Sequence, residues 1–147
     1  MGEFMSRDEI IKIAQGMATA GMPFVLTTVD EKGQPQGRWM GRGVLDEPLT
    51  VWMATGVGSR KVGQLRANPA AQLMYADPQF SRIITISGKC EIVTDMEPKR
   101  RLWEAMPAMS RYVSGPDDPT LGVIMFVGRR VELLNMAEGL VSQVAEL

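Results

Sequence analysis

The stretch that decides the fold is Ile83-Ile84-Thr85-Ile86-Ser87-Gly88-Lys89-Cys90-Glu91-Ile92-Val93, because it is one of the two longest strand-like runs in the chain. Side chains alternate between the two faces of a strand, so every second residue shares a face. One face carries Ile84, Ile86, Gly88, Cys90 and Ile92. The other carries Ser87, Lys89 and Glu91. The alternation predicts a long strand that is buried on one face only.

Five shorter runs on either side of this stretch also predict strands, because they are rich in β-branched and aromatic residues and end at turn residues. They cover residues 24–29, 36–42, 49–54, 71–76 and 123–134. With residues 83–93 they make six strands, joined mainly by turns such as Asp30–Gly33 and Asp77–Pro78. Strands joined in this way favour an antiparallel barrel with flanking helices, a mainly β (α+β) fold.

Three helices are predicted around these strands. The first opens with a capping box made by Ser6 and Glu9, and apolar residues then recur at helical spacing. The second follows Ser59 and stops at Asn68-Pro69, and the third opens with a capping box of Thr94 and Glu97 and runs towards Met106. The tail after Met136 is expected to form a frayed helix.

Composition limits both the size of the fold and its chemistry. A chain of 147 residues with a net charge of −1 fits one globular domain and argues against a dedicated nucleic-acid binder. It has no histidine, and its one cysteine, Cys90, cannot form an intrachain disulfide. These absences exclude histidine-dependent triads and histidine-ligated metals, so we expect no metal site and name no catalytic residue. Cys90 is expected to be a small buried hydrophobe.

The ends of the chain are interpreted separately. Residues 1–4 read as an expression leader before Met5, residues 5–138 as the domain, and residues 139–147 as a C-terminal tail. No run approaches the length of a membrane span, so we expect a cytoplasmic protein.

The residues most informative for function are Thr55–Lys61, a glycine-rich loop that leads into the second helix. Ser59 stands at the N-cap, and free N–H groups at a helix start attract anions. Arg60 and Lys61 add a donor fork and a point charge at the same place. The segment predicts a phosphate site. Its alternative, on local pattern alone, is a capped surface helix with two solvated cations.

A second informative segment is Arg38-Trp39-Met40-Gly41-Arg42-Gly43. Period two places Arg38, Met40 and Arg42 on one face of a strand and Trp39 on the other. Two arginines on one face either meet water or pair with an anionic ligand.

Together and in this order, these segments resemble the pyridoxamine 5′-phosphate oxidase-like family of FMN-binding split barrels. The matching residues are Arg38-Trp39-Met40, then Ala54-Thr55, then Ser59-Arg60-Lys61. The likeness continues through Gln64–Pro69 and the strand that ends at Gly88–Glu91, and it covers about residues 6 to 134. The resemblance implies a six-stranded antiparallel split β-barrel that binds FMN at a homodimer interface.

The resemblance also assigns roles to individual residues. Arg60 and Lys61 neutralise the FMN phosphate, assisted by the hydroxyls of Ser59 and Thr55, and Ala54 precedes them on the same strand. Arg38 and backbone groups of Trp39 and Met40 bond the pyrimidine edge of the ring, where positive charge tunes the cofactor. Trp103 is a candidate for the part of the pocket that the partner chain supplies, and its alternative role is to anchor an amphipathic helix.

Within the family, the chain is similar to the general stress protein branch. Leu102-Trp103 and the loop Gly115–Pro119 carry this likeness. The C-terminal arginine and histidine with which the vitamin oxidase holds its substrate phosphate have no counterpart, and Ile83 takes the place of a glutamine that reaches the flavin. Pyridoxamine phosphate oxidase activity is therefore not expected.

Four functions are compatible with these observations. The first is an FMN-dependent oxidoreductase that uses a nicotinamide or other reductant on an unknown small substrate. The second is a non-catalytic flavin module, either a flavin store or a redox or stress sensor. The third is the same barrel holding a deazaflavin or haem, although the absence of histidine disfavours haem. The fourth, a nucleic-acid barrel using Arg38, Arg42, Arg60 and Arg66, conflicts with the near-zero net charge.

Overall fold

A computed structural model describes residues 5–139 and 141–147. In this part of the chain the helices are α1 (Arg7–Thr19), α2 (Arg60–Ala67) and α3 (Met96–Ala105), with two short 3-10 turns, η1 (Pro107–Arg111) and η2 (Met136–Glu138). The strands are β1 (Phe24–Val29), β2 (Pro35–Met40), β3 (Val44–Asp46), β4 (Thr50–Gly56), β5 (Ala70–Ala76), β6 (Arg82–Val93), β7 (Leu121–Asn135) and β8 (Val141–Glu146). The predicted leader, residues 1–4, lies outside the described residues.

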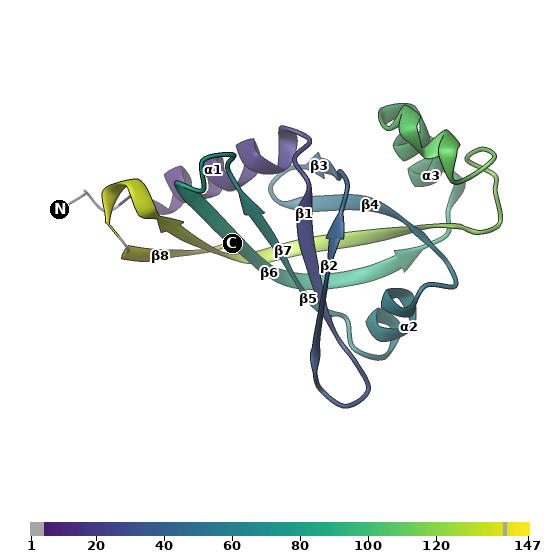
Figure 1. The fold of residues 1–147 in the computed structure, drawn as a ribbon, viewed down its shortest axis with the longest axis horizontal. Helices are drawn as coiled ribbons and strands as arrows, with labels where there is room; N and C mark the ends of the chain where they lie inside the picture. Colours follow the sequence, from purple (N-terminus) through teal and green to yellow (C-terminus); the bar gives the residue numbers. More distant parts are fainter. Residues whose placement is uncertain (1–4, 140) are drawn as a thin grey trace.

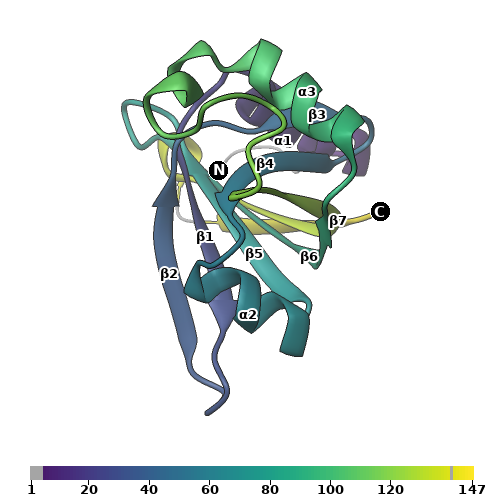
Figure 2. The ribbon, with the colours of Figure 1, turned by 90° about the vertical axis from the view of Figure 1, so that its right-hand side faces the viewer.

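All strand pairs in the sheet are antiparallel. The strand order is β2-β1-β5-β6-β7-β4-β3, with β8 pairing with β7. The two longest strands, β6 and β7, run through the middle of the molecule, while β1 and β2 form an arm that crosses them (Figure 1). After a quarter turn, α1 and α3 lie towards the top and α2 towards the bottom (Figure 2). The mainly β split-barrel fold is confirmed.

The core lies between the inner face of this sheet and α1. Strands β1, β4 and β5 alternate between buried and more exposed residues, as strands with one buried face must. The main core includes Phe24, Leu26, Leu73, Ile84 and Val131, none of which has any exposed area. A second, smaller cluster of Leu102, Met109, Leu121 and Val123 fixes α3 and η1 against the sheet.

The stretch that began the sequence analysis is strand β6, as predicted. Ile84 and Ile86 are fully buried and Cys90 is nearly so, while Lys89 and Glu91 are exposed. Burial raises the pKa of the Cys90 thiol to about 12, so the cysteine is protonated at neutral pH. The pairing of β6 with β7 shifts register between Ser87 and Gly88. The sequence pattern gave no sign of this bulge.

Two features of the prediction are wrong. The described residues form eight strands, not six, because β3 and β8 were missed. With three residues, β3 is too short to show a period. The tail was expected to be helical, but residues 141–146 pair with Arg130–Asn135 of β7. The unpaired edge of β7 supplies hydrogen-bond partners that outweigh the local helix propensity.

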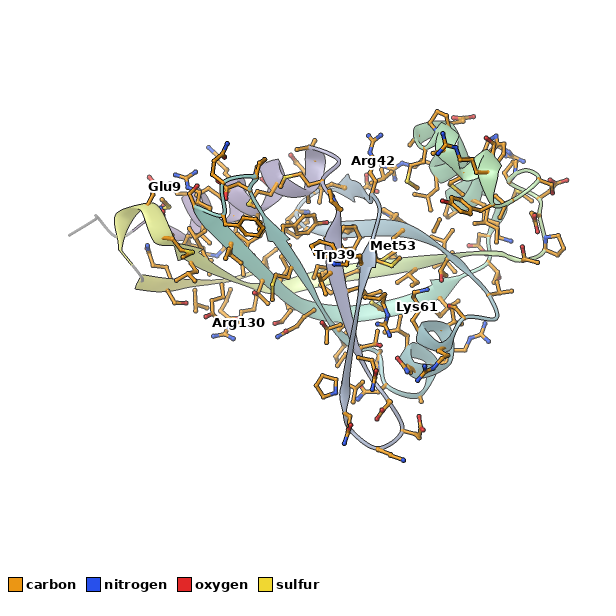
Figure 3. All side chains as sticks on the ribbon, viewed as in Figure 1. Glu9, Trp39, Arg42, Met53, Lys61 and Arg130 are labelled. Carbon is orange, nitrogen blue, oxygen red and sulfur yellow. The ribbon has the colours of Figure 1, made fainter. Side chains whose placement is uncertain are left out.

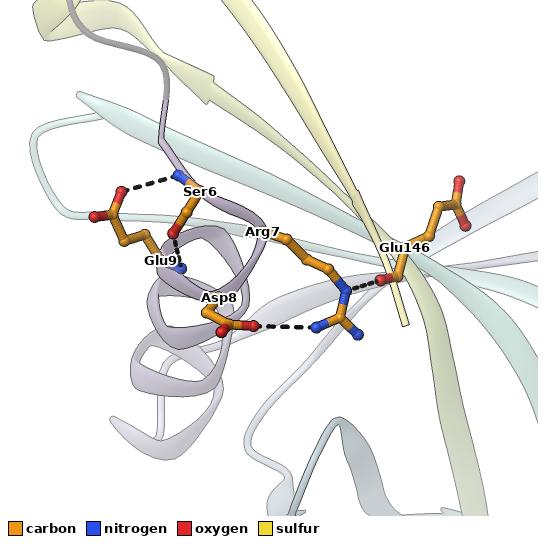
Figure 4. A network of polar contacts seen from close by, with 5 residues as sticks. All are labelled: Ser6, Arg7, Asp8, Glu9 and Glu146. Atoms are coloured by element: carbon orange, nitrogen blue, oxygen red, sulfur yellow. Dashed lines mark hydrogen bonds and ion pairs between the residues drawn. The ribbon is translucent and has the colours of Figure 1, made fainter.

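Helix α1 begins as the predicted capping box requires, but helix α3 does not. At α1, Ser6 Oγ accepts from the Glu9 N–H at 3.2 Å and Glu9 Oε2 accepts from the Ser6 N–H at 3.0 Å, as the capping box predicts (Figure 4). Arg7 Nε donates to the carbonyl of Glu146 at 2.6 Å, which ties α1 to β8. At α3 the N-cap is Asp95 instead of Thr94, and its side chain accepts no capping hydrogen bond. Among the described residues, no helix is long and apolar enough to cross a membrane.

Candidate cofactor site

The predicted site residues come from three neighbouring elements. Strand β2 half-buries Arg38 and Met40 on one face and leaves Trp39 72% exposed on the other, as the alternation predicts. The prediction is wrong for Arg42, because β2 ends at Met40 and Arg42 lies exposed beyond it. Strand β4 ends next to Thr55, and α2 begins at Arg60. Figure 3 shows Lys61 beside α2, below the crossing of the β1–β2 arm with the long strands.

Two hydroxyls and an ammonium group meet where β4 passes into α2. Lys61 Nζ donates to Thr55 Oγ1 at 3.2 Å, and Thr55 Oγ1 lies 3.1 Å from Ser59 Oγ. Ser59 occupies the predicted N-cap position, but its side chain makes no capping hydrogen bond to the helix. The Ser59 hydroxyl therefore remains available to an anion at the start of α2, together with the Thr55 hydroxyl and the Lys61 ammonium group.

Arg38 is held by a buried polar network that the sequence analysis missed. Its Nη1 donates to Thr28 Oγ1 at 2.8 Å and to the Leu26 carbonyl at 3.2 Å, and its Nη2 donates to Gln64 Oε1 at 3.2 Å. Thr28 Oγ1 in turn donates to Gln64 Oε1 at 2.6 Å. Thr28 and Gln64 are buried. A threonine at an inward position of β1 and a glutamine on the buried face of α2 were the available signals.

Three cations, Arg38, Arg60 and Lys61, lie in or near this network. Burial lowers the pKa of Arg38, and nearby Arg60 lowers it further. Burial likewise lowers the pKa of Lys61, and Arg38 adds to that shift. None of the three cations belongs to an ion pair among the described residues. Arg60 does contribute to the lowered pKa of Asp30, whose main cause is the hydrogen bond from the Gln34 backbone. Cations that repel one another without a carboxylate between them suit a doubly charged anion.

The other predicted residues lie around this cluster. Met40 and Ala54 line a groove of about 360 Å³ between the sheet and the α3–η1 segment. Arg60 is exposed in the first turn of α2. Trp103 is half-buried and packs against the small cluster under α3, so in the single chain it anchors the helix. The structure thus brings together Arg38, Thr55, Ser59, Arg60 and Lys61, and leaves Trp103 apart.

We expect Thr28→Val to loosen Arg38 and to destabilise the fold. The substitution keeps the shape but removes a hydroxyl that both accepts from Arg38 and donates to Gln64. Leaving buried polar groups unsatisfied costs about 1–3 kcal/mol, which chemical denaturation would measure. Thr27→Val is the matched control, because Thr27 is the preceding residue and faces the other side of β1. Equal stability of the two variants would contradict a structural role for the network.

Comparison with known proteins places the chain in a family. Residues 19–135 match the model of the pyridoxamine 5′-phosphate oxidase family. The chain belongs to this family. General stress protein 26 of Bacillus subtilis is 27% identical over 116 residues, which make up 77% of this chain and 79% of that protein. The predicted resemblance to the general stress protein branch is confirmed.

Two further comparisons define how far the likeness extends. The pyridoxine/pyridoxamine 5′-phosphate oxidase of Salmonella paratyphi B is 36% identical over 76 residues, which are 52% of this chain but 34% of the oxidase. The chain therefore matches about a third of the oxidase's length. A pyridoxamine 5′-phosphate oxidase-related, FMN binding protein of Nostoc punctiforme shares the fold, with a TM-score of 0.70, 14% identity and 99% of each chain covered.

Proposed function

We propose that the chain binds FMN and acts as an FMN-dependent oxidoreductase on a small molecule. The observation that carries the proposal is that Lys61 meets two hydroxyls at the start of α2. Arg38 lies near enough to lower the pKa of Lys61, Arg60 lies near enough to lower the pKa of Arg38, and none of the three belongs to an ion pair among the described residues. The family supports it, and so does the FMN binding named for the Nostoc relative. Its cytoplasmic location is part of the same proposal.

The residues present fit the chemical groups of FMN. Lys61, Arg60 and the hydroxyls of Thr55 and Ser59 would hold the phosphate, whose two negative charges offset the mutual repulsion of the cations. Arg38, fixed by Thr28 and Gln64, would present its remaining N–H groups to the ring edge, alongside backbone groups of Trp39 and Met40. When bound, FMN supplies the redox chemistry by taking up and releasing electrons. The protein's role is to bind and orient it.

A non-catalytic flavin module is the second candidate function. It is favoured by the absence of histidine from the sequence and by Ile83, which stands where the vitamin oxidase has a glutamine that reaches the flavin. Steady-state reduction by NADH or NADPH, followed by reoxidation with a panel of acceptors, distinguishes the two. Turnover supports the enzyme, and its absence with every pair supports a flavin store or sensor.

The test of the cofactor is the visible absorbance spectrum of the purified protein, with mass spectrometry of the ligand released by heat. A flavin band and the mass of FMN support the proposal. The mass of a deazaflavin would mean that the protein binds this related cofactor instead of FMN. A colourless protein that also fails to bind added FMN would contradict the proposal and leave Arg60 and Lys61 as solvated cations at a helix start.

We further propose a homodimer with the cofactor at its interface, and we propose that the outer face of the sheet around Trp39 is one part of the contact. Register places Trp39 of β2 next to Val25 of β1, and Val25 next to Met74 of β5. Trp39 is 72% and Met74 46% exposed, so this face presents apolar side chains to its surroundings. Exposed apolar side chains that cluster in this way are typical of association surfaces.

The variant Trp39→Glu is expected to weaken the dimer at least about 30-fold, because a tryptophan at the centre of an interface commonly contributes about 2 kcal/mol or more. Sedimentation velocity across a concentration series measures the change. Phe80→Glu is the control, since Phe80 is 63% exposed in the turn between β5 and β6, away from this face. A native chain that sediments as a monomer at every concentration would exclude the dimer.

A further inference from the structure

An apolar groove lies beside the proposed FMN site and has no role in holding the phosphate. Its walls are the segment Met40–Arg42 after β2, Ala54 of β4, and Ala105–Met109 with Tyr112 from the end of α3 and η1. Its volume of about 360 Å³ falls in the range of small-ligand pockets. Three methionines, Met40, Met106 and Met109, contribute to the walls. Thioether side chains adapt their shape and make favourable contacts with aromatic rings.

The groove is continuous with the residues proposed to contact the flavin. Met40 and Ala54 line it, and Ala54 directly precedes Thr55, which accepts from Lys61. A molecule in the groove would therefore meet residues proposed to lie near the FMN ring, and none of the residues proposed to hold its phosphate line the groove. The inference made here rests on the proposed function, because it assigns the substrate class of that same site.

Of the described residues in the wall of the groove, Arg42 is the one that carries a charge. Its Nη1 donates to the carbonyl of Ala105 at 3.1 Å, which fixes the guanidinium across the gap between β2 and α3. Gly21, at φ +71°, gives the side chain room, because a Cβ there would lie 3.2 Å from Arg42 Nε. Figure 3 shows Arg42 extending away from Lys61 on the α3 side of the sheet. The groove thus has its own cation, separate from the phosphate cluster.

We propose that this groove is the substrate site and that it takes planar aromatic molecules with a single negative charge. The ring would contact the methionine side chains, and the acid group would pair with Arg42. One arginine balances one charge. A phosphate dianion is better served by the three cations at the start of α2, so the groove disfavours phosphorylated vitamin substrates.

The experiment is isothermal titration calorimetry, in which naphthalene-2-carboxylate is titrated into the protein purified with its flavin. A separate titration with 2-naphthyl phosphate serves as the comparison. We expect the carboxylate to bind more tightly than the phosphate ester. Arg42→Gln should weaken carboxylate binding about 10- to 100-fold, because a charge-assisted hydrogen bond is lost. Ala108 is exposed in the wall, so Ala108→Glu should weaken binding and Ala108→Lys strengthen it without disturbing the core. Arg111→Gln, an exposed neighbour in η1 outside the wall, should leave it unchanged.

The flavin content of each sample, read from its absorbance, separates the two levels of the proposal. Two results overturn the groove assignment and leave FMN binding intact. In the first, the protein has its full flavin content but does not bind the carboxylate. In the second, it binds the carboxylate, but substitutions at positions 42 and 108 do not change the affinity. Samples that neither carry nor bind FMN overturn the proposed function and the substrate site with it.

Discussion

The double variant Arg60→Ala/Lys61→Ala is expected to lose FMN affinity by about two to four powers of ten. Each cation makes a charge-assisted contact to the phosphate, and such contacts contribute about 1.5–3 kcal/mol each. Lys61 is held beside Thr55 at 3.2 Å, so it is already placed for the ligand and little ordering is needed on binding. The fold should not suffer. Burial and the charge of Arg38 lower the pKa of Lys61, so its removal relieves repulsion in the free protein.

Titration of FMN into flavin-free protein, followed by quenching of flavin fluorescence, measures this loss. Lys12→Ala/Arg100→Ala is the matched control, because it removes the same formal charge from exposed positions on α1 and α3. It should bind FMN with native affinity. If both double variants bind FMN equally well, the start of α2 is not the phosphate site. The cluster of cations and hydroxyls there would then no longer support the proposed function.

Much of the fold could be predicted because the local sequence pattern of these elements matches their burial in the folded protein. In β6, β1 and β4 the buried face is visible as a period of two, and at α1 the capping box needs only residues three apart. Strand β8 could not be found in this way. Its formation depends on the free edge of β7, a partner that is distant until the chain folds. The bulge at Ser87/Gly88 likewise depends on how β6 meets β7.

The candidate site could likewise be predicted only in part. The order of Arg38, Thr55 and Lys61 along the chain supports the family resemblance, and the resemblance predicts that they serve one ligand. The contact between Lys61 and Thr55 is compatible with that prediction. The network that fixes Arg38 was missed, because Thr28 and Gln64 lie on different elements and meet only across the core. Each looks unremarkable in its own segment, one in a strand and one in a helix. Only their shared burial shows that they position the arginine.

Gly88→Ala is expected to destabilise the protein by about 3 kcal/mol or more. Gly88 lies at the bulge between β6 and β7, opposite Gly128. A Cβ at this position would lie 2.1 Å from the carbonyl oxygen of Val127 and 2.9 Å from Cζ of Phe126. The first contact is with backbone in the middle of the sheet, which cannot move without disturbing neighbouring hydrogen bonds. Overpacking of this kind commonly costs about 1–3 kcal/mol and more where the backbone must shift.

Thermal unfolding measures the effect, as a decrease in Tm of about 6–12 °C for a chain of this size. Gly16→Ala is the control, because Gly16 lies in α1 with no atom within 4 Å of an added Cβ. Alanine is the better helix former, so this variant should gain about 0.5–1 kcal/mol. The same chemical change thus has opposite signs at the two glycines. A Tm for Gly88→Ala at or above the native value would mean that the bulge relaxes freely, and the close approach of β6 to β7 would not constrain the barrel.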